Sequence, residues 1–149
     1  MTVLSFRGFT QLAACIAVST ALAGCGSSPT SPTTGPFTKT DVRIGSGLEA
    51  ASGNVLSVQY TGWLYDPAKP DAKGVQFETS VGGTPFSFTL GAGQVIAGWD
   101  QGLPGEKVGG LRRLVIPPSL AYGAVRNGPI PPNATLVFEI ELVDVLQVQ

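Results

Sequence analysis

Hydrophobic residues with helical spacing occur in one short stretch of the chain, Gln94–Leu103. Val95, Trp99 and Leu103 recur at every fourth position, which places them on one helical face. Glycines precede the stretch, and glycine and proline end it, so the pattern predicts a helix with these bounds. Isolated helices shorter than about 12–15 residues are marginal in water. We therefore expect this helix to persist only because strands curve around it.

Alternating apolar and polar residues predict strands on both sides of that helix. In the longest early run, Leu56, Val58 and Tyr60 share one face while the residues between them share the other. The predicted strands are Asp41–Ile44, Asn54–Leu64, Gln76–Thr79, Pro85–Leu90, Leu111–Ile116 and Thr135–Leu146, the last with an irregularity near Val143.

The segments between these strands carry glycine, proline and mixed charge. Tyr65–Val75 is expected to be an exposed loop, Ser119–Tyr122 one helical turn, and Ala124–Asn133 a loop rich in proline and glycine. The pattern as a whole predicts an α+β fold, in which a curved antiparallel sheet of five or six strands wraps around one short helix.

The alternation also predicts which side chains are buried. Phe88, Leu136 and Ile140 are expected in the core. Glu139 and Glu141 share the opposite face of the last strand, so they are expected on its solvated side.

Length and composition narrow the classes of function. A chain of 149 residues allows one domain, and a net charge of −1 argues against a nucleic-acid partner. Arg112 and Arg113 are adjacent, but on a strand they point to opposite faces. The chain has no histidine, which excludes every Ser–His or Cys–His nucleophile. Two cysteines, Cys15 and Cys25, provide no disulfide framework or zinc site, and we expect neither metal nor cofactor.

Residues Met1–Gly24 have the features of an export signal. Arg7 precedes an apolar run, and the run ends in small residues. The sequence Leu22–Cys25 resembles the bacterial lipobox, in which Cys25 is lipidated and becomes the first residue after cleavage. An uncleaved membrane anchor is the alternative, but the run falls short of the ~20 apolar residues that a span requires.

A segment without charges follows the predicted lipidation site. Gly26–Pro36 consists of Gly, Ser, Thr and Pro, so it cannot form a core and is expected to be a flexible tether. The predicted organisation is a signal (1–24), lipidated Cys25 with a tether (25–37), and a folded domain (38–149). Acyl chains on Cys25 would anchor an exported protein to the membrane. Many lipoproteins that stay at the inner membrane have Asp directly after the lipidated cysteine, whereas this chain has Gly26 there. In a cell with two membranes, the outer membrane is therefore the favoured location.

Several motifs, in the same order along the chain, resemble the FKBP-type peptidyl-prolyl cis-trans isomerases. The fold expected from that resemblance is a half-open antiparallel sheet around a short helix, as the alternation also predicts. The motifs are V-Q-Y-T-G (58–62), Q-F-E-T-S (76–80), P-F-S-F-T-L-G (85–91), Q-V-I-A-G-W (94–99), L-A-Y-G (120–123) and I-P-P-N-A-T-L-V-F-E-I-E-L (130–142).

The resemblance implies an apolar substrate pocket whose floor is Trp99. Ile96 would offer its backbone N–H to a substrate carbonyl, Tyr122 its hydroxyl, and Ile130 would lie on the flap. The catalytic set implied in this way is Tyr60, Phe77, Glu78, Trp99, Tyr122 and Phe138. The substrate-binding set is Phe86, Gln94, Val95, Ile96 and Ile130.

Three departures from the family pattern bear on this pocket. Glu78 stands where the best-known members have Asp, so its hydrogen bond to Tyr60 or to substrate is in doubt. Gln94 replaces a Glu that contacts ligand through its backbone, so this contact is expected to survive. The flap between Gly123 and Ile130 is slightly shorter and lacks the His often found there.

The function expected from the resemblance is isomerisation of X–Pro bonds in exported proteins by a monomer. Proline-containing polypeptides are the expected partners, and FK506-type macrolides are expected to bind. One alternative is a module that binds proline-containing segments with weak turnover. Another is an adhesive surface domain, in which replacing Trp99 would leave function unchanged.

Overall fold

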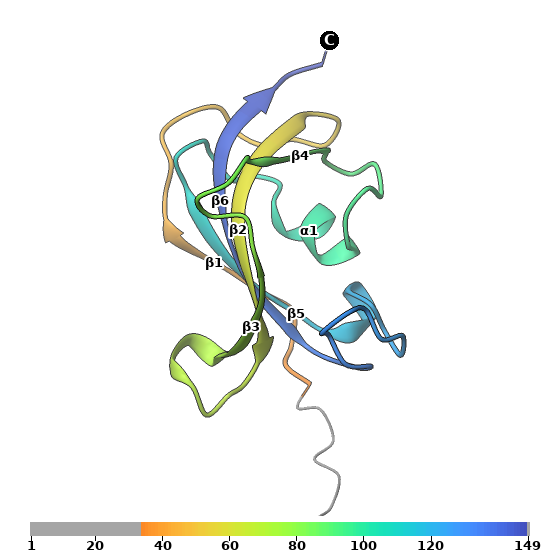
Figure 1. Cartoon of the computed structure of the whole chain (residues 1–149). Coiled ribbons are helices and arrows are strands. Elements are labelled where there is room, and N and C mark those ends of the chain that lie inside the picture. Colours follow the sequence, from red (N-terminus) through yellow and green to blue (C-terminus); the bar gives the residue numbers. More distant parts are fainter. Residues whose placement is uncertain (1–33, 149) are drawn as a thin grey trace, which may run out of the picture.

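A bent antiparallel sheet encloses one short helix (Figure 1). The computed structural model describes residues 34–148, so the predicted signal, Cys25 and most of the tether lie outside the described residues. The strands are β1 (Thr38–Arg43), β2 (Val55–Tyr65), β3 (Lys73–Thr79), β4 (Phe86–Thr89), β5 (Leu111–Ile116) and β6 (Leu136–Leu146). The helix is α1 (Ala97–Gly102), and two 3₁₀ turns, η1 (Pro70–Ala72) and η2 (Pro118–Leu120), complete the elements. The predicted α+β architecture is confirmed, with six strands.

The order of strands across the sheet is β1-β5-β6-β2-β3, and β4 also pairs with β2. The two longest strands, β2 and β6, form its centre and pair from Val55 opposite Leu146 to Leu64 opposite Leu136. Their register shifts at one place, where Val143 has no partner on β2. This confirms the predicted irregularity, and a bulge of this kind bends a strand and increases its twist.

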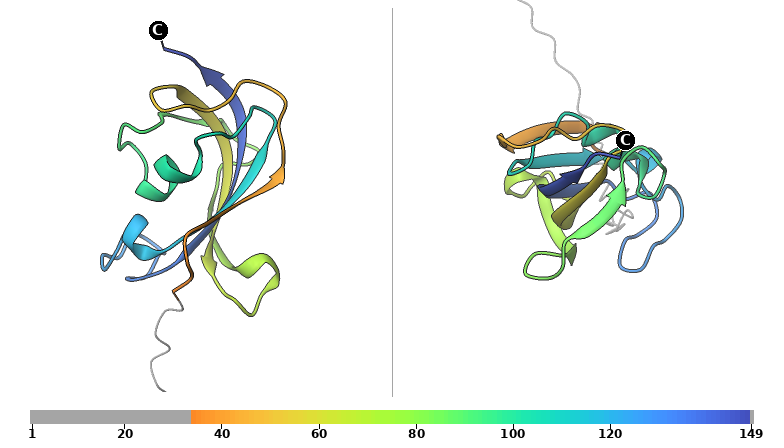
Figure 2. Two further views of the ribbon diagram at one scale, coloured as in Figure 1. Left: turned by 180° about the vertical axis from the view of Figure 1, so that it is seen from behind. Right: turned by 90° about the horizontal axis from the view of Figure 1, so that it is seen from above.

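Helix α1 lies on the concave side of the sheet, as two further views show (Figure 2). Trp99 and Leu103 are buried, with 4% and 1% of their surface exposed. The helix approaches β5 closely because Gly98 and Gly102 face Ile116 and Leu114 without side chains of their own. Of the predicted apolar stripe, Trp99 lies within the helix and Leu103 at its C-cap, and both join the core, whereas Val95 precedes the helix and is only partly buried.

The helix is shorter than the sequence predicts, because it begins at Ala97 with Ile96 as its N-cap. Gly91 and Gly93 adopt positive φ angles. The Gln94 side chain accepts a hydrogen bond from the Thr89 amide (2.8 Å). These features hold the segment before Ile96 in a turn. Of the predicted helix Gln94–Leu103, only Ala97–Gly102 is therefore helical.

Strand β3 begins earlier than predicted and shortens the expected loop after β2. Lys73, placed in that loop because of its charge, pairs with Tyr65 of β2. Its ammonium lies 4.7 Å from the centre of the Trp63 ring and 2.6 Å from a Glu139 oxygen. Lys73 can therefore lie in the sheet because Glu139 and the Trp63 ring stabilise its positive charge. Strand β1 likewise begins at Thr38 rather than Asp41.

The predicted core residues Phe88, Leu136 and Ile140 are buried. The prediction for Glu139 is wrong: its side chain is only 18% exposed and lies 2.8 Å from Arg113. Burial alone would raise the pKa of Glu139, but hydrogen bonds from Lys73 and Arg113 hold it below its usual value. Glu141 is solvated as predicted, and it pairs with Arg43.

The two adjacent arginines point to opposite faces, as expected. Arg112 donates hydrogen bonds to the carbonyl oxygens of Gly102 (2.8 Å) and Pro104 (3.1 Å) at the end of α1. Arg113 binds Glu139 on the other face. Between residues 34 and 148, no helix has the length and hydrophobicity to cross a membrane.

Candidate functional site

A cavity of about 280 Å³ lies over α1. The side chains around it come from β2, β3, β4, β6, α1, the turn before α1 and the segment after η2. Its lining residues are Tyr60, Glu78, Phe86, Gln94, Val95, Ile96, Trp99, Tyr122 and Phe138. All nine belong to the set predicted from the sequence.

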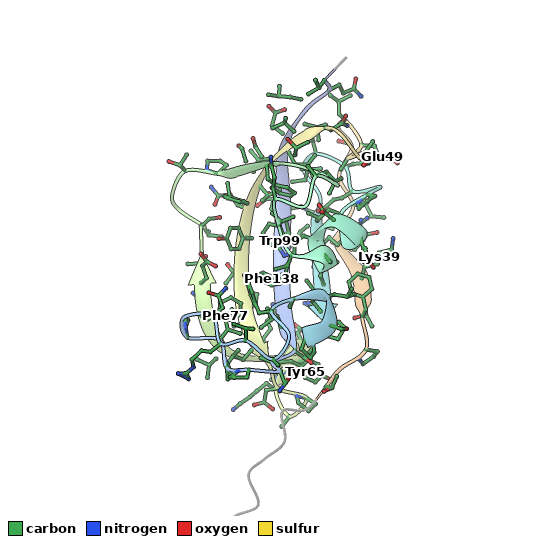
Figure 3. The ribbon with its side chains drawn as sticks, turned by 90° about the vertical axis from the view of Figure 1, so that its right-hand side faces the viewer. Lys39, Glu49, Tyr65, Phe77, Trp99 and Phe138 are labelled. Atoms are coloured by element: carbon green, nitrogen blue, oxygen red, sulfur yellow. The ribbon has the colours of Figure 1, made fainter. Side chains whose placement is uncertain are left out.

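Aromatic rings packed edge-on around Trp99 form the base of this cavity. Figure 3 labels three residues of this aromatic cluster, Trp99, Phe138 and Phe77. The ring centre of Trp99 lies 5.1 Å from that of Tyr60 and 5.3 Å from that of Phe138, at interplanar angles of 78° and 89°. Such T-shaped contacts are favourable because the positive edge of one ring meets the negative face of another. Trp99 and Phe138 are buried, whereas Phe86 is 41% exposed. The base is therefore fixed by packing, and the rim remains accessible.

Two tyrosine hydroxyls and one carboxylate bring polar chemistry to the cavity. Burial, a hydrogen bond to Glu78 and the charge of Glu78 together raise the pKa of Tyr60 to about 12. Burial and the same charge raise the pKa of Tyr122, while a hydrogen bond with Asn127 opposes the shift. Both phenols are therefore protonated at neutral pH and can donate hydrogen bonds. The extra methylene of Glu78 does not prevent its contact with Tyr60.

The turn before α1 supplies backbone groups to the cavity. Ile96 has an extended conformation (φ −60°, ψ 147°), and its carbonyl accepts a hydrogen bond from Trp99 N–H (2.9 Å). The Ile96 amide itself has no backbone acceptor within residues 34–148. The Trp99 indole N–H is also buried without a partner in the described structure. Buried donors in proteins are nearly always paired, so the unpaired indole N–H distinguishes this site from an ordinary packed core.

A second cavity of about 350 Å³ adjoins the first and shares Glu78 and Tyr122 with it. Two of the predicted residues, Phe77 and Ile130, line this cavity instead of the first. Phe77 still belongs to the aromatic cluster, since its ring centre lies 5.6 Å from that of Phe138. The structure thus distributes the eleven predicted residues over two adjoining hollows.

Asn127 and Pro129 also line the second cavity, and the sequence reasoning did not select them. They lie in the loop Ala124–Asn133, whose first part is the flap that the family resemblance implies, but the resemblance names only Ile130 on it. The dipeptide Asn127–Gly128 followed by proline is a turn signal. That signal shows that the loop folds back on itself, but not which of its side chains line a cavity. In the described part of the chain, no group of three or more Cys, Asp and Glu side chains is arranged to hold a metal ion.

The fold and the cavity define a half-barrel that presents an aromatic pocket beside its single helix. Comparison with known proteins shows which family has this fold and pocket. Residues 47–143 match the FKBP-type peptidyl-prolyl cis-trans isomerase family.

Individual relatives agree with this match. The chain is 46% identical over 109 residues to an FK506-binding protein of Neisseria meningitidis serogroup B, covering 72% of this chain and 94% of that one. It is 47% identical over 106 residues to a 46 kDa FK506-binding nuclear protein of Spodoptera frugiperda, covering 70% of this chain but only 24% of that longer protein. The crystal structure of AtFKBP13 superposes with a TM-score of 0.62 at 36% identity and covers 72% of this chain and 91% of that one.

The chain therefore belongs to the FKBP-type peptidyl-prolyl cis-trans isomerases, a family of enzymes. The family and the enzyme class predicted from the sequence motifs are confirmed. The roles of the individual site residues remain predictions.

Proposed function

We propose that the protein catalyses cis–trans isomerisation of X–Pro peptide bonds in the cavity over Trp99. The observation that carries this proposal is the aromatic enclosure itself. Tyr60, Phe86 and Phe138 stand edge-on around one indole and leave a cavity of about 280 Å³. A proline ring is a compact apolar group that fits such an enclosure.

The reaction needs no nucleophile, because no covalent bond is made or broken. Rotation about the peptide bond has a barrier of ~18–20 kcal/mol, since twisting removes amide resonance. The twisted amide has less charge separation than the planar one. An enclosure that excludes water therefore disfavours the planar form more, which lowers the barrier. A 10⁵-fold acceleration corresponds to about 7 kcal/mol.

The lining residues suggest how one side of the bond is held. The proline ring lies against Trp99, the Ile96 amide donates to a substrate carbonyl, and the Tyr122 hydroxyl donates a second hydrogen bond. Tyr60, Phe77, Phe86, Val95 and Phe138 enclose the ring. The residue before proline is then free to rotate. The same enclosure is expected to accept FK506-type macrolides.

We further propose that the substrates are exported proteins. The lipobox-like sequence ending at Cys25 supports this proposal, since a lipidated cysteine would hold the domain at a membrane. In a cell with two membranes, the residue after Cys25 favours the outer one. Incorporation of labelled palmitate into the parent, but not into Cys25→Ala, is the expected result. Equal labelling of both would contradict the anchor.

The activity is tested with a proline-containing peptide and the chain from Gly26 onward, which retains all described residues. The expected result is isomerisation faster than the spontaneous reaction, which takes tens to hundreds of seconds. Folding of the sample is verified by its circular dichroism. A folded sample that leaves the spontaneous rate unchanged would overturn the proposal.

A binding module with weak turnover is the second candidate, and Glu78, which stands where the best-known members have Asp, is the residue that tests it. Because the Glu78 carboxylate already accepts a hydrogen bond from Tyr60, we expect Glu78→Asp to bring no gain in rate. A shorter side chain lengthens that contact, so the expected change in kcat/KM is a decrease of up to about fivefold. Peptide affinity is measured on the same samples. A large gain in rate with unchanged affinity would instead show that the natural chain is suited to binding.

A further inference from the structure

A bulge in β3 brings a carboxylate to the border between the two cavities. Neighbouring residues of a strand normally point to opposite faces of the sheet. In β3 the register shifts between Gln76 and Glu78, so Phe77 has no partner on β2. An extra residue of this kind changes the direction of the side chains beside it. Phe77 and Glu78, although adjacent, therefore both line the second cavity, and Glu78 lines the first as well.

Glu78 is the only charged residue among the described residues that line these two cavities. It is exposed, and it forms no ion pair with any residue between positions 34 and 148. Arg126, the charged residue of the flap, is exposed and lines neither cavity. The negative charge at the border therefore has no neutralising partner in the described chain, and it complements a positive group on a bound peptide.

The second cavity suits the stem of a long basic side chain. It measures about 350 Å³, and Phe77, Pro129 and Ile130 give it apolar walls. Ile130 is buried, and the Phe77 ring packs 5.6 Å from that of Phe138, so two of these walls are fixed by the core. Lysine and arginine lay their apolar stems along such a surface and keep the charged end accessible to water. The charged end would then meet the exposed carboxylate of Glu78.

A residue next to the bound proline lies within reach of the second cavity. The two cavities share Glu78 and Tyr122 as walls. Consecutive Cα atoms are about 3–4 Å apart across a peptide bond. When the proline ring occupies the cavity over Trp99, the side chain of a neighbouring residue can therefore enter the adjoining one.

We propose that Glu78 is a specificity-determining residue, which selects X–Pro substrates that carry lysine or arginine directly before or after the proline. The inference rests on the proposed isomerase function and names the substrate class that the site prefers. The stem of the basic residue lies in the second cavity, and its charge pairs with Glu78.

Peptides that differ only in charge measure this preference. One peptide carries lysine directly before the proline, and another carries it directly after. Each has a counterpart with acetyl-lysine, which keeps the stem and removes the charge. The measured quantity is the ratio of kcat/KM for the lysine peptide to that for its counterpart. We expect a ratio of about two- to fivefold in at least one placement, as a solvent-accessible ion pair provides. Salt at about 0.5 M should lower this ratio, because it screens the pair.

Three variants show whether Glu78 is the source of the ratio. Glu78→Gln should bring it to unity, whereas Glu78→Asp keeps the charge and should retain a ratio above unity. Asp144→Asn is the matched control, since it also removes one negative charge, but from an exposed residue that lines neither cavity. It should keep the parent ratio. Because each ratio compares two peptides on one enzyme, a change in the overall rate of a Glu78 variant does not alter it.

The outcomes distinguish this inference from the proposed function. A folded parent that accelerates isomerisation of none of the peptides overturns the proposed function, and the inference with it. An active parent with a ratio of unity in both placements overturns only the inference. A ratio that persists in Glu78→Gln, or that Asp144→Asn abolishes equally, also overturns it, because the preference then does not come from the charge of Glu78.

Discussion

Replacing Gly98 with alanine is expected to destabilise the domain by about 1–3 kcal/mol, although alanine is the better helix former. A Cβ atom at this position would collide with Ile116 Cγ2 and lie 2.7 Å from Ile116 Cδ1. Ile116 is fully buried in β5, so it has no free space to move into. Helix α1 must therefore shift, and Trp99 shifts with it. We expect a lower urea midpoint and a loss of peptide isomerisation.

Two companion variants test this explanation. Gly83→Ala, where the nearest atom to the new Cβ is the Ser80 oxygen at 3.4 Å, should leave stability almost unchanged. Ile116→Ala is itself destabilising, but adding Gly98→Ala to it should cost much less than in the parent, because the obstructing side chain is gone. Full stability of Gly98→Ala in the parent background would show that α1 is not packed on β5 as described.

The free energy of unfolding is also expected to fall as the pH rises, because Glu106 is buried. This side chain is 3% exposed, and neither carboxyl oxygen has a hydrogen-bond partner in the described structure. Arg112 lies nearby but donates its hydrogen bonds to Asp41 and to carbonyl groups after α1. Burial raises the pKa of Glu106 from 4.5 to about 8; the charge of Arg112 opposes this shift and that of Asp41 adds to it.

The sign of the effect follows from the proton balance. Below pH 4.5 both the folded and the unfolded chain carry this proton. Between pH 4.5 and about 8 the unfolded chain loses it and the folded chain keeps it, so the free energy of unfolding falls. The full difference is on the order of 5 kcal/mol. Because the chain has no histidine, few other side chains titrate between pH 6 and 8. Urea unfolding across that range should therefore show the decrease clearly.

Glu106→Gln should remove this decrease and be more stable than the parent above pH 8. Glu139→Gln is the contrasting variant. The pKa of Glu139 is lowered, so its loss should reduce stability by a similar amount at every pH from 6 to 9. A parent stability that does not change between pH 6 and 8 would contradict the assignment of a protonated Glu106 in the folded state.

Much of the site could be predicted because its residues belong to segments with strong local patterns. Alternation placed Tyr60 and Phe138 on the inner faces of β2 and β6, and spacing placed Trp99 on the apolar face of α1. Motif order then assigned these residues to one pocket. Asn127 and Pro129, which line the second cavity, were missed because they lie in a loop without periodicity, and such a loop carries no pattern that says which of its side chains face a cavity.

Six strands, a helix on the concave side and the aromatic residues that meet there could all be predicted from the residue pattern, although the ends of β1, β3 and α1 could not, because hydrophobic periodicity encodes which face of an element is buried. The pairing of charged groups could be seen only in the folded chain. Lys73 and Glu139 enter the sheet because they neutralise each other, whereas Glu106 is buried without a hydrogen-bond partner and so favours its protonated form. The free energy of a buried charge depends on neighbours that are distant in the sequence, and periodicity contains no information about them.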